Sequence, residues 1–228
     1  MKRSDGIVCI SDYTRDLVKA EARQTWVVPN AVDASFFNVH RASQPQGRFL
    51  VAGTICAHKN QNHLIRSLES LAGEGGLHVH FVGDCPQHDP YAQEFLRLIS
   101  SRPWCSFSGF ANREKLKRLL SESTALLIPS LEDNCPMVVL EAAAVGVPAI
   151  GSRIGGIPGL IDHGTTGFLF PADDALALRE AVRRLVQHPA EAEAMGQAAK
   201  KRALQQFTPT VIARRHLEIY RELLNRDR

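Results

Sequence analysis

Two acidic residues flank an apolar run in the stretch SLEDNCPMVVLEAA (residues 130–143). Asp133 follows the strand-like run ALLIP, and Glu141 lies inside a segment of helical character. Proline suits the first turn of a helix and glycine its end, so we expect a helix from Pro136 to Gly146. Its first backbone amides would lie between the two carboxylates, an arrangement that suits the hydroxyls and phosphates of a nucleotide sugar. The alternative is that Asp133 caps the helix and Glu141 is solvated.

Two further loops follow strand-like runs. Gly53 ends RFLVAG, and Lys59 precedes a helix whose free amides would favour an anion, so Lys59 is either a phosphate ligand or a solvated loop lysine. Gly83 ends LHVHFVG, and Asp84, which follows it, could bind a ligand hydroxyl or form an Asx turn. Ligands of open parallel sheets bind beyond the carboxyl ends of the strands, so we expect these loops to meet near Asp133.

Strand-like and helical segments alternate along the chain, which predicts an α/β fold with a Rossmann-like, doubly wound parallel sheet. The expected strands are GIVCI, TWVV, RFLVAG, LHVHFVG, CSFSG, ALLIP, PAIG and GFLF, and helical periodicity marks residues 60–73, 89–100 and 112–123. Two apolar stripes are expected to be core or docking faces. They are formed by Leu178, Val182 and Leu185, and by Ala213, Leu217, Tyr220 and Leu224.

The composition is that of a globular protein, with 228 residues, 44% hydrophobic and 22% charged. The formal charge is +3, and the basic clusters are interspersed with acids and lack aromatic neighbours, so solvated helix faces are expected and no nucleic-acid site. The five cysteines form no C-x-x-C pair, which predicts neither a disulfide framework nor a metal site and favours a cytoplasmic location. Glu141, Gly146 and Pro148 interrupt residues 137–150, so this stretch is expected to be a buried helix and strand, not a membrane span.

The chain resembles the C-terminal, donor-binding half of the retaining GT-B glycosyltransferases of family four. The resemblance runs from VCISDYTRDLV to YRELL. It depends on VVPNAVD, VAGTICAHKNQNHLI, FVGDCP, FSGF, PSLEDNCPMVVLEAAAVGVPAI and GSRIGGIPGLIDHGTTGFLFPADD. It implies transfer of a hexosyl group, with retention of configuration, from a nucleoside-diphosphate sugar to a saccharide or lipid-linked acceptor. No cofactor and no metal are required by that mechanism.

The resemblance also assigns roles to residues. Glu141 would bind the ribose hydroxyls, Asp133 the hexose hydroxyls, and Lys59 the diphosphate, and these three are the expected catalytic residues. The remaining donor-binding residues are Gly53, Thr54, Gly83, Asp84, Phe110, Ala111, Asn134, Cys135, Pro136, Met137 and Val138, with Phe110 and Ala111 beside the base.

Three positions depart from the family pattern. Asp133 stands where Glu is usual, and Gly159 follows GGIP where Glu is usual. Thr54 replaces an arginine that supplies a second positive charge to the leaving group. The sequence therefore predicts a weaker phosphate site, unless Arg153 or another cation compensates.

The expected domains are a remnant of an N-terminal domain (1–28), a linker (29–46), the nucleotide-sugar domain (47–206) and a helix that packs back towards the N-terminal domain (207–228). Most of an N-terminal domain would be missing, so a second domain or chain is an expected partner, with peripheral contact to the inner face of a membrane possible. The competing hypotheses are a non-catalytic nucleotide-sugar-binding module and one subunit of a two-chain enzyme. A nicotinamide dehydrogenase is disfavoured because no G-x-G-x-x-G joins a strand to a helix.

Overall fold

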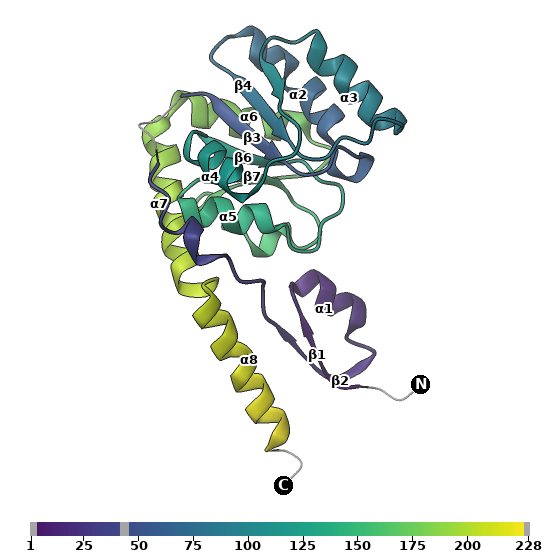
Figure 1. Ribbon diagram of the computed structural model, residues 1–228, viewed down its shortest axis with the longest axis vertical. Coiled ribbons are helices and arrows are strands. Elements are labelled where there is room, and N and C mark those ends of the chain that lie inside the picture. Colours follow the sequence, from purple (N-terminus) through teal and green to yellow (C-terminus); the bar gives the residue numbers. More distant parts are fainter. Residues whose placement is uncertain (1–3, 42–45, 226–228) are drawn as a thin grey trace.

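The computed structural model describes residues 4–41 and 46–225. The predicted ranges 1–28, 29–46 and 207–228 therefore include residues outside the described ones, namely 1–3, 42–45 and 226–228. Two units are present, a large α/β unit and a small N-terminal one, and the last helix runs from the former to the latter (Figure 1).

The large unit contains a six-stranded sheet in which every neighbouring pair is parallel. Its strands are β3 (Arg48–Ala52), β4 (His78–Val82), β5 (Cys105–Phe107), β6 (Ala125–Ile128), β7 (Ala149–Ser152) and β8 (Gly167–Phe170). The spatial order is β5-β4-β3-β6-β7-β8, so the chain winds outwards from β3 in one direction and then from β6 in the other. This is the doubly wound, Rossmann-like sheet predicted from the sequence, and the point where the order reverses lies between β3 and β6.

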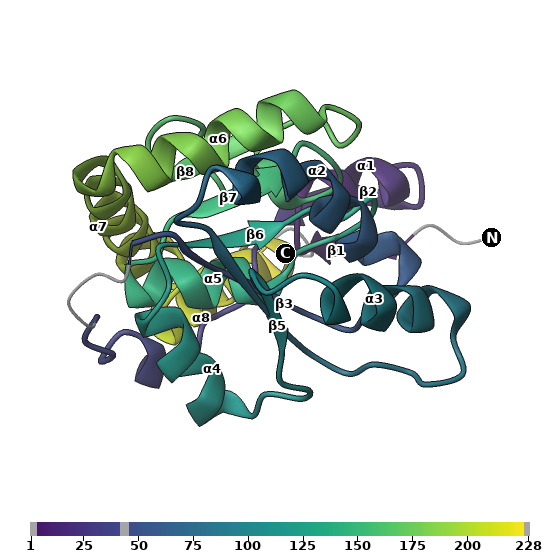
Figure 2. The same cartoon turned by 90° about the horizontal axis from the view of Figure 1, so that it is seen from above.

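Helices cover both faces of this sheet (Figure 2). On one face lie α2 (Gln61–Gly73), α3 (Pro90–Ser100) and α6 (Ala175–Gln187), and on the other lie α4 (Arg113–Ser121) and α5 (Met137–Val145). Short 3-10 turns form at η1 (Ala34–Phe36), η2 (Ala57–Lys59) and η3 (Ile157–Gly159). The predicted stripe of Leu178, Val182 and Leu185 is buried on α6 and belongs to the core.

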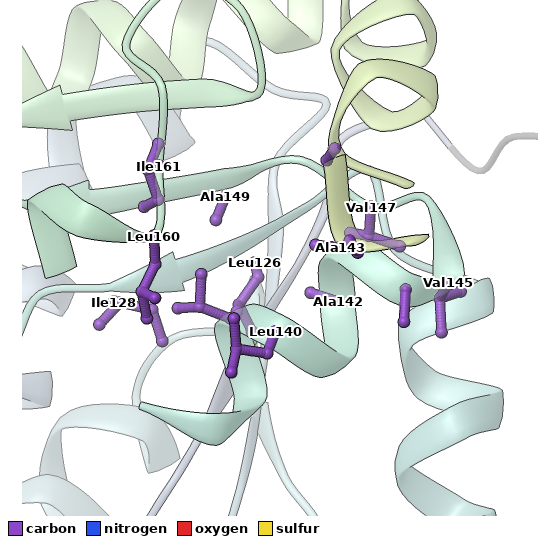
Figure 3. Packing of buried hydrophobic residues seen from close by; sticks show 14 of the residues in the cluster. Leu126, Ile128, Leu140, Ala142, Ala143, Val145, Val147, Ala149, Leu160 and Ile161 are labelled. Carbon is purple, nitrogen blue, oxygen red and sulfur yellow. The ribbon is translucent and has the colours of Figure 1, made fainter. Parts of the chain in front are cut away.

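Helix α5 is buried on almost every side, because β6, β7 and the segment after β7 surround it (Figure 3). Leu140 and Ala142 are completely buried against Leu126 and its neighbours. The helix starts directly after Pro136 and stops at Gly146, whose φ of 92° is a left-handed conformation that favours glycine. Residues 137–150 are thus the buried helix and strand that the sequence predicts, and none of the described helices is long and apolar enough to span a bilayer.

Helix α7 (Pro189–Gln206) was not among the segments marked by helical periodicity, and it packs closely on α5. Its contact face consists largely of small residues, among them Ala199 and Ala203. A Cβ atom on Gly196 would lie 2.1 Å from the carbonyl oxygen of Gly146, so the two backbones meet where neither residue has a side chain. This contact fixes α5, which carries Glu141.

The N-terminal unit consists of β1 (Ser4–Cys9), α1 (Asp12–Val18) and β2 (Ala22–Val27), with β1 and β2 parallel. Helix α8 (Pro209–Leu224) lies beside these strands (Figure 1) and buries Ile219 against Trp26 and Val28. The indole Nε1 of Trp26 also donates a hydrogen bond to Glu222 Oε2 (3.3 Å).

Leu217, Tyr220 and Leu224 do not form a core face, because these side chains are more than half exposed, so a docking face stays the prediction for this stripe. Ala213 of the same stripe is exposed as well. The packing face of α8 is instead formed by Ile212, Ile219 and Leu223. An apolar stripe therefore remains on the outer side of the helix.

Candidate functional site

A cleft opens beyond the carboxyl ends of β3, β4, β5 and β6, at the point where the strand order reverses. Ligands bind at this position in open α/β sheets. The cleft has a volume of about 380 Å³. Its lining includes eleven residues predicted for the donor site, namely Gly53, Thr54, Lys59, Gly83, Asp84, Phe110, Ala111, Pro136, Met137, Val138 and Glu141. Folding therefore brings together residues from four separate loops.

Close backbone contacts form the floor of the cleft. The amide of Gly53 donates to the carbonyl of Val82 (2.9 Å), and the amide of Gly83 donates to the carbonyl of Gly109 (3.0 Å). A Cβ atom on Gly83 would lie 2.0 Å from the carbonyl oxygen of Gly53, far inside van der Waals contact. Glycine at position 83 thus allows the loops after β3 and β4 to touch.

Asp133 does not line the cleft itself. It lies behind Lys59, beside a small cavity that it shares with Gln61 and Ser130. Its Oδ2 atom is 2.5 Å from Lys59 Nζ, and the two side chains are 11% and 27% exposed. This excludes two of the alternatives considered above. Asp133 does not cap α5, and Lys59 is not a freely solvated loop lysine.

Asn134 and Cys135, two of the predicted donor-binding residues, also do not line the cleft. The backbone of Asn134 packs on Gly156, where an added Cβ atom would lie 1.7 Å from the Asn134 carbonyl oxygen. The Cys135 side chain is buried in the core, and this burial raises the pKa of its thiol. Both residues hold the loop in place.

Glu141 lies in the cleft wall on α5, one turn after the start of that helix. Burial raises the pKa of its carboxyl group above the ordinary value, and the nearby Arg113 partly opposes this rise. Arg113 is itself paired with Asp33 at 2.9 Å. Glu141 is thus a partly desolvated carboxylate, and hydrogen bonds donated by a ligand would stabilise its charged form.

Phe110 is the one aromatic residue among those that line the cleft, and 75% of its surface is accessible. Its backbone carbonyl and that of Ser108 accept hydrogen bonds from Lys115 Nζ (3.4 and 2.7 Å), so α4 fixes the loop that presents the ring. An exposed ring at this edge offers a stacking surface for a planar base.

Sequence reasoning missed three apolar lining residues, Ala52, Val82 and Leu116. Ala52 and Val82 end the two strands directly before the predicted glycines, so the strand pattern could have identified them as lining residues. Leu116 comes from α4 and carries no signal in the sequence that separates it from an ordinary core leucine.

The positive charge of the cleft is limited. Among the lining residues Lys59 is the one cation, since Thr54 is uncharged and Arg153 lies outside the cleft with an exposed side chain. The first turn of α5, with Met137 and Val138 in the lining, supplies the positive end of a helix dipole. Within residues 4–41 and 46–225, no group of three or more histidine, cysteine, aspartate or glutamate side chains could hold a metal ion.

Comparison with known proteins identifies the fold and the family. The model of the family described as glycosyl transferases group 1 matches residues 32–202. The chain belongs to this family. It is 30% identical over 98% of its length to the α-maltose-1-phosphate synthase of Mycolicibacterium smegmatis, and covers 64% of that protein. It is 28% identical over 75% of its length to the N-acetyl-α-D-glucosaminyl L-malate synthase of Bacillus anthracis, and covers 44% of that protein.

Among solved structures, Anabaena Alr3699/HepE in complex with UDP and glucose superimposes with a TM-score of 0.82. The sequence identity is 19%, and the match covers 96% of this chain and 63% of that one. The likeness shows that this chain has the Rossmann-like architecture of GT-B enzymes. The chain spans less than two thirds of the length of these proteins.

Proposed function

We propose that this chain is the donor-binding part of a retaining hexosyltransferase, which transfers a hexosyl group from a nucleoside-diphosphate sugar. The observation that carries the proposal is the cleft at the strand-order reversal. There Lys59, the start of α5 and Glu141 line one cleft, Asp133 pairs with Lys59 from behind it, and Phe110 offers a stacking surface. Family membership supports the class of reaction, because the matching family model covers three quarters of the chain.

Each part of the donor has a chemical counterpart in the cleft or, for Asp133, directly behind Lys59. The Glu141 carboxylate accepts hydrogen bonds from the ribose hydroxyls, and the base stacks beside Phe110 and Ala111. Lys59 and the amides at the start of α5 bind the diphosphate, because both supply positive charge there. Asp133 accepts hydrogen bonds from the hexose hydroxyls.

The reaction depends on charge stabilisation and positioning. When the bond between the sugar and the diphosphate breaks, negative charge grows on the leaving phosphate, and Lys59 and the α5 amides stabilise it in the transition state. An acceptor hydroxyl attacks from the same face of the sugar, which retains the configuration. A fixed contact of this kind lowers the barrier by about 2–4 kcal/mol. No metal and no further cofactor are needed for these steps.

The acceptor is a saccharide or a lipid-linked saccharide. The relatives extend beyond this chain, so we assign most of the acceptor site to a second domain or a second subunit. The reaction would take place in the cytoplasm, in some cases at the inner face of a membrane. If the chain binds a nucleotide sugar but shows neither hydrolysis nor transfer when combined with such a partner, the non-catalytic binding module is the better description.

Titration calorimetry with UDP, ADP and GDP, each paired with a hexose derivative, tests the proposal. One pair should bind, and Glu141→Ala should weaken that binding by roughly tenfold or more, because it removes hydrogen bonds to the ribose. Glu122→Gln is a matched control that removes an acid remote from the cleft. Unchanged affinity in Glu141→Ala would remove Glu141 from the site, and no binding by any pair would overturn the proposed function.

A further inference from the structure

The positive charge that a diphosphate needs is that of Lys59, and Lys59 is already paired with Asp133. The atoms are 2.5 Å apart, and the Asp133 side chain is only 11% exposed. Lys59 is the one cation among the residues that line the cleft, all of which lie in the described part of the chain. Two charges at this separation and depth neutralise one another to a large extent. In this state the cleft therefore offers a diphosphate little net positive charge from side chains.

The backbones that carry the two side chains are fixed to each other. The amide of Leu131 donates to the carbonyl of His58 (2.7 Å), which joins the Asp133 loop to the Lys59 loop. The amide of Gly156 donates to the carbonyl of Asp133 (2.8 Å). A Cβ atom on Gly155 would lie 2.1 Å from that same carbonyl oxygen, so the loop after β7 packs directly on Asp133. The ion pair can therefore separate by rotation of its side chains, without movement of either loop.

A phosphate that binds Lys59 must compete with Asp133, and the competition has a cost. Breaking the pair leaves a carboxylate in a place that is almost closed to water, and an unpaired buried charge is strongly unfavourable. A free nucleoside diphosphate has no group that can replace Lys59 as the partner of Asp133. The sugar of a nucleotide sugar does, because its hydroxyls donate hydrogen bonds to a carboxylate.

We propose that Asp133 makes this site select nucleotide sugars over free nucleoside diphosphates by an exchange of partners. The diphosphate takes Lys59, and the hexose hydroxyls take the carboxylate that Lys59 leaves. This inference rests on the proposed function, and it adds that the same residue weakens binding of the diphosphate product once the sugar has gone. Product release is thereby favoured, because Asp133 re-forms its pair with Lys59.

The test is Asp133→Asn, a change that keeps the shape of the side chain and removes its charge. Calorimetry on the full 228-residue chain would use whichever pair binds among UDP with UDP-glucose, ADP with ADP-glucose and GDP with GDP-mannose. The free diphosphate should bind about tenfold more tightly to the variant, a change of about 1.4 kcal/mol. The ratio of the two affinities should move towards the free diphosphate by at least as much.

Two controls separate this exchange from a general effect of charge. Glu132→Gln removes the same charge from the adjacent, exposed residue, so it should change the affinity for the diphosphate by less than about twofold. In a Lys59→Gln background, Asp133→Asn should no longer strengthen diphosphate binding, because the coupling between the two side chains has been removed. Thermal denaturation of every variant shows whether it is folded under the conditions of the titration.

The outcomes distinguish the two proposals. If the diphosphate binds the natural chain and Asp133→Asn leaves its affinity unchanged or lower, the exchange is refuted and the proposed function stands. Equal effects of Asp133→Asn and Glu132→Gln also refute the exchange. If no nucleotide or nucleotide sugar binds the natural chain or the folded Asp133→Asn variant, both proposals fail.

Discussion

Gly83 provides the sharpest test of how the floor of the cleft is built. In Gly83→Ala the new Cβ atom would lie 2.0 Å from the carbonyl oxygen of Gly53 and 3.1 Å from the amide nitrogen of Thr54. Carbon and oxygen atoms in close contact stay roughly 3.3 Å apart, so the two loops must separate by more than about 1 Å. The φ of Gly83 is 148°, where a side chain adds strain.

The expected cost follows from the contacts that this separation breaks. The hydrogen bonds from Gly53 to Val82 (2.9 Å) and from Ile55 to Asp84 (2.8 Å) hold these loops together. Each buried hydrogen bond that is lost costs about 1–3 kcal/mol. Backbone strain adds about 1 kcal/mol or more. Gly83→Ala should therefore lower the free energy of unfolding by roughly 3–7 kcal/mol, a large part of the stability of an ordinary domain.

Two other glycines distinguish the effect of the close contact on stability from the effect of backbone strain. Gly109 has a φ of 66° but nothing within 4 Å of an added Cβ atom, so Gly109→Ala should cost only the strain, about 1 kcal/mol. Gly159 has neither feature, so Gly159→Ala should be neutral or slightly stabilising. Urea denaturation measures the free energy of unfolding of all three variants, and the slope of the transition checks the two-state assumption. If Gly83→Ala is no more destabilising than Gly109→Ala, the close contact between the loops is not present in solution.

Two further predictions concern α5 and α8. Because burial raises the pKa of Glu141, stability that is present below the ordinary pKa is lost as the pH rises through the raised one. Glu141→Gln should therefore raise the melting temperature at about pH 7 and lose that advantage near pH 4, and equal shifts at both pH values would contradict the raised pKa. On α8, Ile219→Ala should cost about 2–4 kcal/mol because the side chain is buried, whereas Leu217→Ala should change stability by less than about 0.5 kcal/mol. The exposed stripe should also promote self-association of the natural chain in light scattering, reduced in Leu217→Ala, and a clean monomer at high concentration would count against this.

Much of the fold was predictable because local signals agree with the tertiary structure. The strands are short apolar runs that end in glycine or a polar turn, and a fully buried parallel sheet has this pattern. Pro136 and Gly146 mark both ends of α5, since one fits the start of a helix and the other its left-handed end. The order of strands and helices then leaves few topologies, which places the loops after β3, β4 and β6 at one edge of the sheet.

The sequence could not decide whether the predicted stripe on α8 is a core face or a docking face, for a physical reason. This helix carries apolar residues on two faces, Ile212, Ile219 and Leu223 on one and Leu217, Tyr220 and Leu224 on the other. Periodicity shows that each stripe exists, but it cannot show which one meets a partner. Helix α7 was overlooked for a related reason, because its buried face is alanine and glycine apart from Met195. Such a face gives a weak hydrophobic signal even though it allows very close packing.

The ion pair between Lys59 and Asp133 was also not predictable, although both residues were marked as candidates. They are separated by 74 positions in the sequence, and only the exact approach of two loops decides whether their side chains meet. Sequence reasoning treated them as independent ligands for two parts of one substrate. The structure couples them, so under the proposed function neither binds the donor without releasing the other. The shorter side chain at position 133 and the missing second cation at Thr54 then have a common consequence. The site depends on a single lysine, and the residue that holds this lysine in the absence of ligand is the one proposed to receive the sugar.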